Sequence, residues 1–168
     1  GAVARLYHSM ALLLPDASVL VAGGGAPGPF TNSNAEIYYP PYLFDAAGTL
    51  AARPQITAAP ASIVPGGSFA ISVSAQDTIA RINLIKTGSV THSWNMDQRS
   101  TGLAFTQTGT SITLTAPASS NLMPPGYYML FALNSEGVPS IARIVKAETA
   151  PTTPPAPPPT PTSESDNP

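Results

Sequence analysis

Short strand-like runs, each closed by glycine or proline, are the feature that most constrains the fold of this chain. The runs are rich in valine, isoleucine, threonine and tyrosine, and helical periodicity is almost absent. Twenty prolines and thirteen glycines separate the runs. This pattern is typical of an all-β protein. We predict strands at 8–14, 18–22, 35–39, 55–58, 68–74, 79–86, 90–94, 102–108, 111–115, 127–134 and 140–146.

The punctuation divides the chain into three predicted parts. Residues 1–50 contain a hairpin and a third strand, which together are too few to bury themselves in isolation and should pack on a neighbour. Residues 51–147 hold the remaining strands, separated by turns at regular intervals, which indicates an immunoglobulin-like β-sandwich. Residues 148–168 are rich in proline and threonine, so we expect a disordered tail or a stiff linker, with or without a module beyond it.

Composition excludes several classes of function. Charged residues make up only 10% of the chain and the net charge is −2, so there is no basic stripe for a nucleic acid. No apolar run approaches the roughly 20 residues of a membrane helix. The chain has no cysteine, which rules out disulfides and thiolate ligands within it. Because the sequence opens almost directly into a predicted strand, without the pattern of a signal peptide, we expect it to start inside a larger protein.

The first conspicuous motif runs over residues 5–24. It contains Tyr7-His8-Ser9, an apolar strand, a Pro15-Asp16 turn and a glycine-terminated second strand, and it resembles a kelch repeat, the four-stranded blade of a β-propeller. Residues 35–38 fit a later strand of the same blade. Many kelch repeats carry a histidine near this position for structural hydrogen bonding, and this segment alone favours that role for His8.

The second motif, Thr91-His92-Ser93, contains the only other histidine in the chain. Its presence makes a purely structural role for His8 less favoured. It continues to Arg99 as Trp-Asn-Met-Asp-Gln-Arg. Together with Tyr7-His8 and the aromatic runs at 40–44 and 125–131, it resembles the C-terminal third of the galactose oxidase and glyoxal oxidase family. The resemblance covers residues 5–146. It implies a partial kelch propeller blade followed by an immunoglobulin-like "early set" domain.

In that family two histidines and two tyrosines hold copper, and one tyrosine is joined to a cysteine and stores a radical. Carried over to this chain, the resemblance implies that Tyr7, His8 and His92 are metal ligands, with Tyr7 also acting as the catalytic general base. The tyrosine–cysteine cofactor is expected only from absent upstream residues. Independently of the resemblance, imidazole is a favoured ligand of copper. Neighbouring side chains of a regular strand point to opposite faces, so joint ligation requires Tyr7 and His8 to lie at a strand end, bulge or loop.

The resemblance implies a C-terminal fragment of a secreted, extracellular copper-radical oxidase. The full enzyme would oxidise a primary alcohol or an aldehyde with O2 and release H2O2, and the fragment alone would be inactive. The expected partners are the upstream propeller of the same protein and a small alcohol, aldehyde or carbohydrate, with no nucleic acid and no membrane span. The alternative is a non-catalytic kelch and immunoglobulin-like module that binds a carbohydrate or a surface.

Other polar and aromatic residues allow two interpretations each. Asp97 and Arg99 could pair as acid and base, but we expect them to brace the loop that presents His92. Five tyrosines could stack on sugar rings, although core packing is the commoner use; they are Tyr38, Tyr39, Tyr42, Tyr127 and Tyr128. The loop at 25–34 lacks the cysteines that some relatives place there, which leaves the substrate open.

Overall fold

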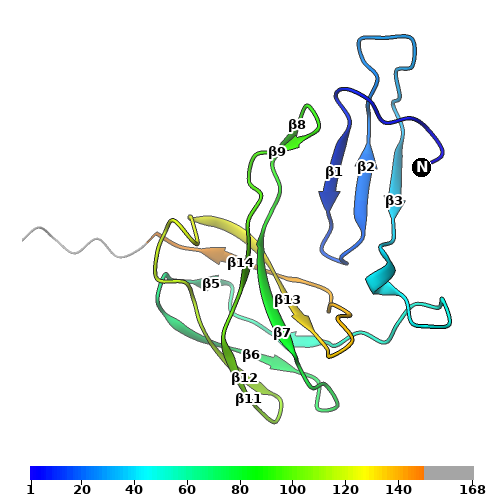
Figure 1. The fold of residues 1–168 in the computed structure, drawn as a ribbon. Helices are drawn as coiled ribbons and strands as arrows, with labels where there is room; N and C mark the ends of the chain where they lie inside the picture. Colours follow the sequence, from blue (N-terminus) through cyan, green and yellow to red (C-terminus); the bar gives the residue numbers. More distant parts are fainter. Residues whose placement is uncertain (150–168) are drawn as a thin grey trace, which may run out of the picture.

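The computed structural model describes residues 1–149, and this part is all-β with one short 3-10 helix, η1 (Pro41–Leu43) (Figure 1). The predicted tail at 148–168 lies outside the described residues except for its first two. Among the residues described, no helix is long and apolar enough to cross a membrane. The strands are β1 (Met10–Leu13), β2 (Val19–Ala22), β3 (Ala35–Tyr38), β4 (Ile56–Ala58), β5 (Ser62–Ile63), β6 (Ser68–Val73), β7 (Arg81–Lys86), β8 (Val90–Thr91), β9 (Trp94–Asn95), β10 (Ser100–Gly102), β11 (Phe105–Thr108), β12 (Ser111–Thr115), β13 (Gly126–Leu133) and β14 (Arg143–Ala147).

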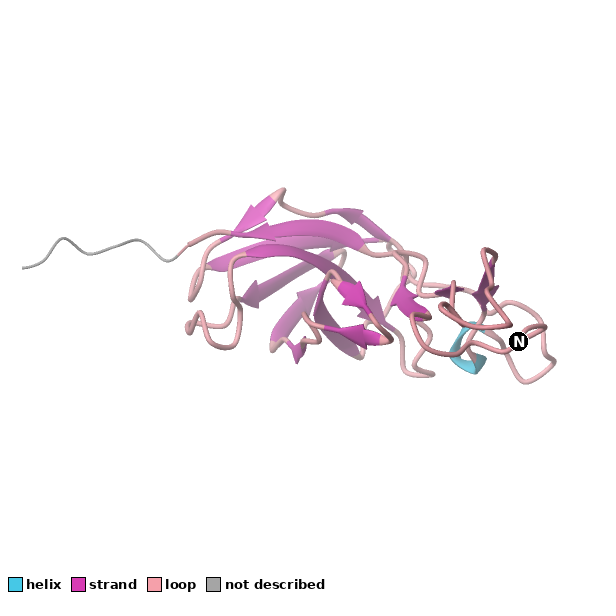
Figure 2. Cartoon of the chain, turned by 90° about the horizontal axis from the view of Figure 1, so that it is seen from above, coloured by secondary structure: helices cyan, strands magenta, loops and turns pink. Residues whose placement is uncertain are grey.

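Two stacked sheets form an immunoglobulin-like sandwich from β4 onward. One sheet has the strand order β10-β7-β13-β14-β5 and the other has the order β11-β12-β6-β4. All neighbours are antiparallel except β14 and β5, which run parallel. Figure 2 shows these strands as two layers, with the N-terminal part of the chain at one end. The layers enclose one apolar cluster that contains Ile71, Leu84, Ile112 and Leu130, each at most 2% exposed.

The alternation of side chains along each strand explains this core. In β12 the burial pattern is exposed–buried over five residues, with Ile112 and Leu114 inward and the serine and threonines outward. β13 differs because both of its faces are covered. Tyr128 and Leu130 point into the sandwich, whereas Met129 and Phe131 belong to a second buried cluster on the opposite face. The long apolar run of β13 therefore marks a strand between two cores.

The N-terminal strands form a separate antiparallel sheet, β1-β2-β3, which lies beside the sandwich (Figure 1). The second cluster joins the two units, since it combines Ala17 and Leu43 from the N-terminal part with Phe131 from β13. Hydrogen bonds reinforce this joint. The backbone N–H of Ala142 donates to the Pro15 carbonyl at 2.8 Å across the joint, and Arg53, in the segment that connects the N-terminal part to β4, donates to two carbonyls of the loop before β14.

Most predicted strands are present with slightly shorter bounds, but two predictions were wrong. The strand predicted at 90–94 is a hairpin, because the chain reverses at His92 and Ser93 between β8 and β9. The strand predicted at 102–108 is two strands in different sheets, because β10 pairs with β7 whereas β11 pairs with β12. The short strand β5 was missed, since two residues carry no periodicity.

Candidate metal centre

Tyr7 and His8 lie in a tight turn immediately before β1. The backbone N–H of Ser9 donates to the Leu6 carbonyl at 3.0 Å, and His8 has a φ of +67°. This left-handed backbone breaks the alternation of a strand, so adjacent side chains can lie on the same side. The Tyr7 and His8 rings are accordingly close, with centroids 4.0 Å apart and planes inclined by 31°. The requirement for a turn at Tyr7-His8 is thus met.

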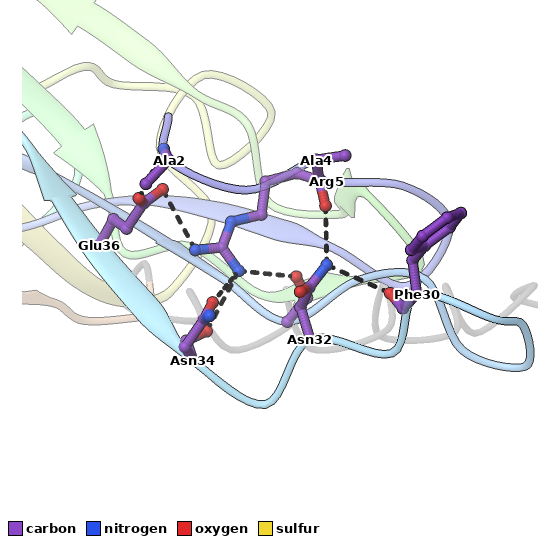
Figure 3. A network of polar contacts seen from close by, with 8 residues as sticks. Ala2, Ala4, Arg5, Phe30, Asn32, Asn34 and Glu36 are labelled. Atoms are coloured by element: carbon purple, nitrogen blue, oxygen red, sulfur yellow. Dashed lines mark hydrogen bonds and ion pairs between the residues drawn. The ribbon is translucent and has the colours of Figure 1, made fainter.

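A partly buried arginine anchors the segment that leads into this turn (Figure 3). The Arg5 side chain is 12% exposed, and its Nη1 donates to the Gly23 carbonyl at 3.0 Å and to Asn34 Oδ1 at 2.7 Å. Its Nη2 forms an ion pair with Glu36 Oε2 at 3.2 Å. The hydrogen bond from the Ala2 N–H, followed by the contact with Arg5, lowers the pKa of the Glu36 carboxyl. Arg5 therefore ties the N-terminal segment to the end of β2 and the start of β3.

The loop at 25–34 holds the His8 imidazole directly. His8 Nδ1 lies 2.7 Å from the Ala26 carbonyl oxygen, and the Gly25 N–H donates to the Tyr7 carbonyl at 2.8 Å. Gly25 has a φ of +84°, and a Cβ there would lie 1.9 Å from the Phe30 carbonyl oxygen, so only glycine fits. Because a carbonyl can only accept, a neutral His8 donates from Nδ1 and keeps the lone pair on Nε2.

His92 stands at the tip of the β8–β9 hairpin, which rises from the sandwich beside β1 (Figure 1). Thr91 pairs with Trp94, so His92 and Ser93 form a two-residue loop with φ values of +52° and +63°. Type I′ turns require positive φ at both central residues and normally contain asparagine or glycine. A histidine and a serine are strained in this conformation. The chain tolerates this strain at the point where it presents His92.

Three of the predicted site residues converge between the two units. The His8 and His92 rings have centroids 4.4 Å apart with planes inclined by 68°, and the Tyr7 and His92 centroids are 5.7 Å apart. A hydrogen bond between Ser9 Oγ and Ser93 Oγ, at 3.2 Å, joins the residues that follow each histidine. Residues more than eighty positions apart in sequence therefore meet at one point.

The donor atoms of this cluster suit a metal ion. His92 Nδ1 lies 2.6 Å from the Thr91 hydroxyl, so both histidines have Nδ1 engaged. No hydrogen bond to either Nε2 is found within residues 1–149, and Tyr7 is 60% exposed. Two imidazole nitrogens and a phenol oxygen are a set that suits Cu(II). In the same range no three His, Cys, Asp or Glu side chains gather to bind a metal, so a site here depends on Tyr7.

Asp97 and Arg99 lie at the base of the hairpin rather than at its tip. Asp97 forms an ion pair with Lys86 of β7 at 2.8 Å, and its backbone N–H donates to Asn95 Oδ1. Arg99 donates to the Asn121 carbonyl. Both residues therefore tie the foot of the hairpin to the sandwich, and within the described chain neither of them hydrogen-bonds to His92.

Residue types and spacing alone did not identify the residues that hold the two histidines. Thr91, Ser9 and Ser93 all lie in the quoted motifs, but no sequence signal links Ser9 to Ser93 or Thr91 to an imidazole nitrogen. Arg5 and Ala26 were missed for a similar reason. Ala26 acts through its backbone carbonyl, which leaves no trace in the residue types, and the partners of Arg5 lie 18 or more positions away in sequence.

Comparisons with known proteins agree with this architecture. The family model described as "Galactose oxidase-like, Early set domain" matches residues 53–147. A galactose oxidase from Gibberella zeae is 40% identical over 149 residues, covering 87% of this chain and 22% of the relative. The aldehyde oxidase GLOX from Vitis pseudoreticulata is 37% identical over 163 residues, covering 87% of this chain and 30% of the relative.

Among solved structures, a fungal alcohol oxidase of the AA5 family in complex with copper matches with a TM-score of 0.78 and 37% sequence identity. The match covers 86% of this chain and 31% of that structure. The chain belongs to the galactose oxidase-like family, whose members among these relatives are galactose, alcohol and aldehyde oxidases. It spans less than a third of the length of each of these relatives.

Proposed function

We propose that this chain supplies Tyr7, His8 and His92 to the copper site of a copper-radical oxidase. The single observation that carries the proposal is the convergence of both histidines and Tyr7, with the His8 and His92 ring centroids 4.4 Å apart. They are the only histidines in the chain, and they lie beside different sheets, His8 before β1 and His92 between β8 and β9. A purely structural histidine in the N-terminal sheet would need no counterpart from the sandwich.

The full oxidase is proposed to convert a primary alcohol or an aldehyde with O2 and to release H2O2 outside the cell. Bound copper would supply the electron-accepting chemistry. His8 and His92 would fix its position through Nε2, because Nδ1 of each is already engaged. The exposed Tyr7 side chain, as the phenolate that metal coordination favours, would accept the proton of the substrate hydroxyl on its oxygen.

The tyrosine–cysteine radical cofactor must come from outside this sequence, since the chain contains no cysteine. Residues 1–50 are proposed to be one kelch blade of a larger propeller, residues 51–147 the domain that delivers His92, and residues 148–168 a linker or tail. The upstream propeller of the same protein would then be the partner that completes the site. On this basis the chain alone binds copper but does not oxidise alcohols.

The alternative, a non-catalytic module that binds a carbohydrate or a surface, has weaker support. Tyr42 and Tyr128 have structural roles, because their hydroxyls donate to the Ala17 and Pro124 carbonyls and burial raises the pKa of each. Tyr38 and Tyr39 are exposed at the end of β3, whereas Tyr127 is exposed on β13 of a different sheet. The exposed tyrosines are therefore divided between the two units.

A copper titration of the chain tests the proposed function. We expect one Cu(II) per chain, with much weaker binding in His8→Ala and His92→Ala and weaker binding in Tyr7→Phe. Tyr38→Phe is the matched control, because Tyr38 is exposed on β3 and lies outside the cluster. Wild-type binding that survives both histidine substitutions would contradict the proposal. Peroxide produced from an alcohol by the chain and copper alone would contradict the predicted inactivity.

A further inference from the structure

We infer that Thr91 is a positioning residue that orients the His92 imidazole for metal binding. The inference rests on the proposed function, which assigns His92 as a ligand, and it concerns the contact between Thr91 Oγ1 and His92 Nδ1 at 2.6 Å. Of the two groups that hold the imidazoles by Nδ1, this is the only one that a side chain provides. It can therefore be removed by substitution.

The need for such a contact follows from the position of His92. Its side chain stands at the tip of a two-residue hairpin loop and is exposed, so no surrounding core fixes the ring. The Thr91 hydroxyl is the one hydrogen-bond partner of the imidazole within the described chain. Without it the ring would rotate about its two side-chain torsions and would lose entropy on binding a metal.

The two histidines differ in whether their hydrogen-bond partner fixes the proton on Nδ1. The Ala26 carbonyl beside His8 Nδ1 can only accept, whereas the hydroxyl of Thr91 can donate or accept. When His92 binds a metal through Nε2, its Nδ1–H donates to Thr91 Oγ1. The hydroxyl is then the acceptor for the Nδ1–H of a metal-bound histidine, as a carboxylate, carbonyl or water is in most metal sites. Loss of such an acceptor weakens metal affinity by about 10–100-fold.

Backbone geometry supports the same role. Thr91 is the last residue of β8 and pairs with Trp94 across the hairpin, so its own backbone is fixed by the strand pair. The positive φ of His92 turns the chain directly after Thr91. Thr91 is therefore a fixed point from which a hydroxyl reaches the neighbouring ring.

The test compares Thr91→Val, which keeps the β-branched shape and removes the hydroxyl, with Thr91→Ser, which keeps the hydroxyl. Thr113→Val on β12 is the matched control, because Thr113 is an exposed strand threonine in the sandwich, on a different sheet from Thr91. We expect Thr91→Val to weaken Cu(II) binding about 10–100-fold and to change the copper electron paramagnetic resonance spectrum. Thr91→Ser and Thr113→Val should retain both affinity and spectrum. Equal affinity and an unchanged spectrum in Thr91→Val would overturn the inference.

A measurement on the metal-free chain separates this inference from the proposed function. The 15N resonances of the imidazoles should change at His92 in Thr91→Val and stay unchanged at His8. If the wild-type chain binds no copper, the proposed function fails, and the resonances alone decide whether Thr91 positions His92. A His92 Nδ1 resonance that is identical in wild type and Thr91→Val would then overturn the role of Thr91.

Discussion

Ser9 and Ser93 are 84 positions apart in sequence, yet their hydroxyl oxygens lie 3.2 Å apart across the boundary between the two units. Each serine directly follows a histidine of the proposed copper site. The contact therefore links the turn that carries His8 to the hairpin that carries His92, independently of any metal.

A double-mutant cycle measures this link. In the free energy of unfolding, Ser9→Ala and Ser93→Ala should show a coupling of about 0.5–1 kcal/mol, because an exposed hydrogen bond contributes little net stability. Chemical denaturation of the four variants gives the value. Ser9→Ala combined with Ser111→Ala on β12 is the control pair and should be additive. A coupling for Ser9 and Ser93 no larger than that of the control pair would contradict the link.

Because Ser93 has a positive φ, we expect a glycine variant at this position to be more stable than an alanine variant, the reverse of the usual order in a strand. Both Ser93→Gly and Ser93→Ala lack the hydroxyl, but only glycine is unstrained at a φ of +63°. We expect the glycine variant to be more stable than the alanine variant by about 1 kcal/mol. At Ser111, within β12, the same comparison should have the opposite sign, since glycine weakens a strand interior. Thermal denaturation of the four variants decides, and an alanine variant at least as stable as Ser93→Gly would argue against the left-handed turn.

Asp16 in the turn between β1 and β2 predicts a loss of stability in acid. Partial burial would raise the pKa of its carboxyl, but the Ser18 hydroxyl and backbone N–H donate to it and, with Arg53 nearby, hold the pKa below its ordinary value. A lowered pKa in the folded state means that this stabilisation is complete above the ordinary pKa of about 4 and is lost as the pH falls through the folded value. Asp16→Asn should therefore be less stable than wild type at pH 7, and the difference should shrink in acid. Denaturation of both proteins between about pH 2 and pH 7, a range that includes that pKa, measures the difference in unfolding free energy. A difference that stays constant over this range would contradict a lowered pKa for Asp16.

Phe131 predicts how strongly the N-terminal sheet depends on the sandwich. It is 2% exposed and belongs to the cluster that includes Ala17 and Leu43. Phe131→Ala should cost about 3–5 kcal/mol of unfolding free energy and should speed amide exchange in β1–β3. Leu84→Ala serves as the comparison for stability, because Leu84 lies in the core of the sandwich. This substitution should cost about 2–5 kcal/mol of unfolding free energy. Amide exchange in β1–β3 as slow in Phe131→Ala as in wild type would show that the sheet is stable without this contact.

The sequence predicts the strands well where burial follows a period of two, as in β12, or where a long apolar run is closed by a turn, as in β13. The strand predicted at 90–94 is wrong, because a histidine followed by a serine does not indicate a loop with two positive φ values. The convergence of Tyr7, His8 and His92 was expected only through the family resemblance. The hydrogen bond that holds His8 uses a backbone carbonyl, and the contact between Ser9 and Ser93 joins residues 84 positions apart, so residue types could not indicate either. The Thr91 hydroxyl lies next to His92 in sequence, but its residue type alone does not show that it bonds to the ring.

The most direct test of the central claim is the number of imidazole nitrogens bound to one copper ion, measured by pulsed electron paramagnetic resonance on the chain loaded with one equivalent of Cu(II). The convergence of His8 and His92 predicts two imidazoles on a single copper, and one after either His8→Ala or His92→Ala. A spectrum with one imidazole in the wild-type chain, or one that is unchanged when either histidine is removed, would contradict a shared copper site.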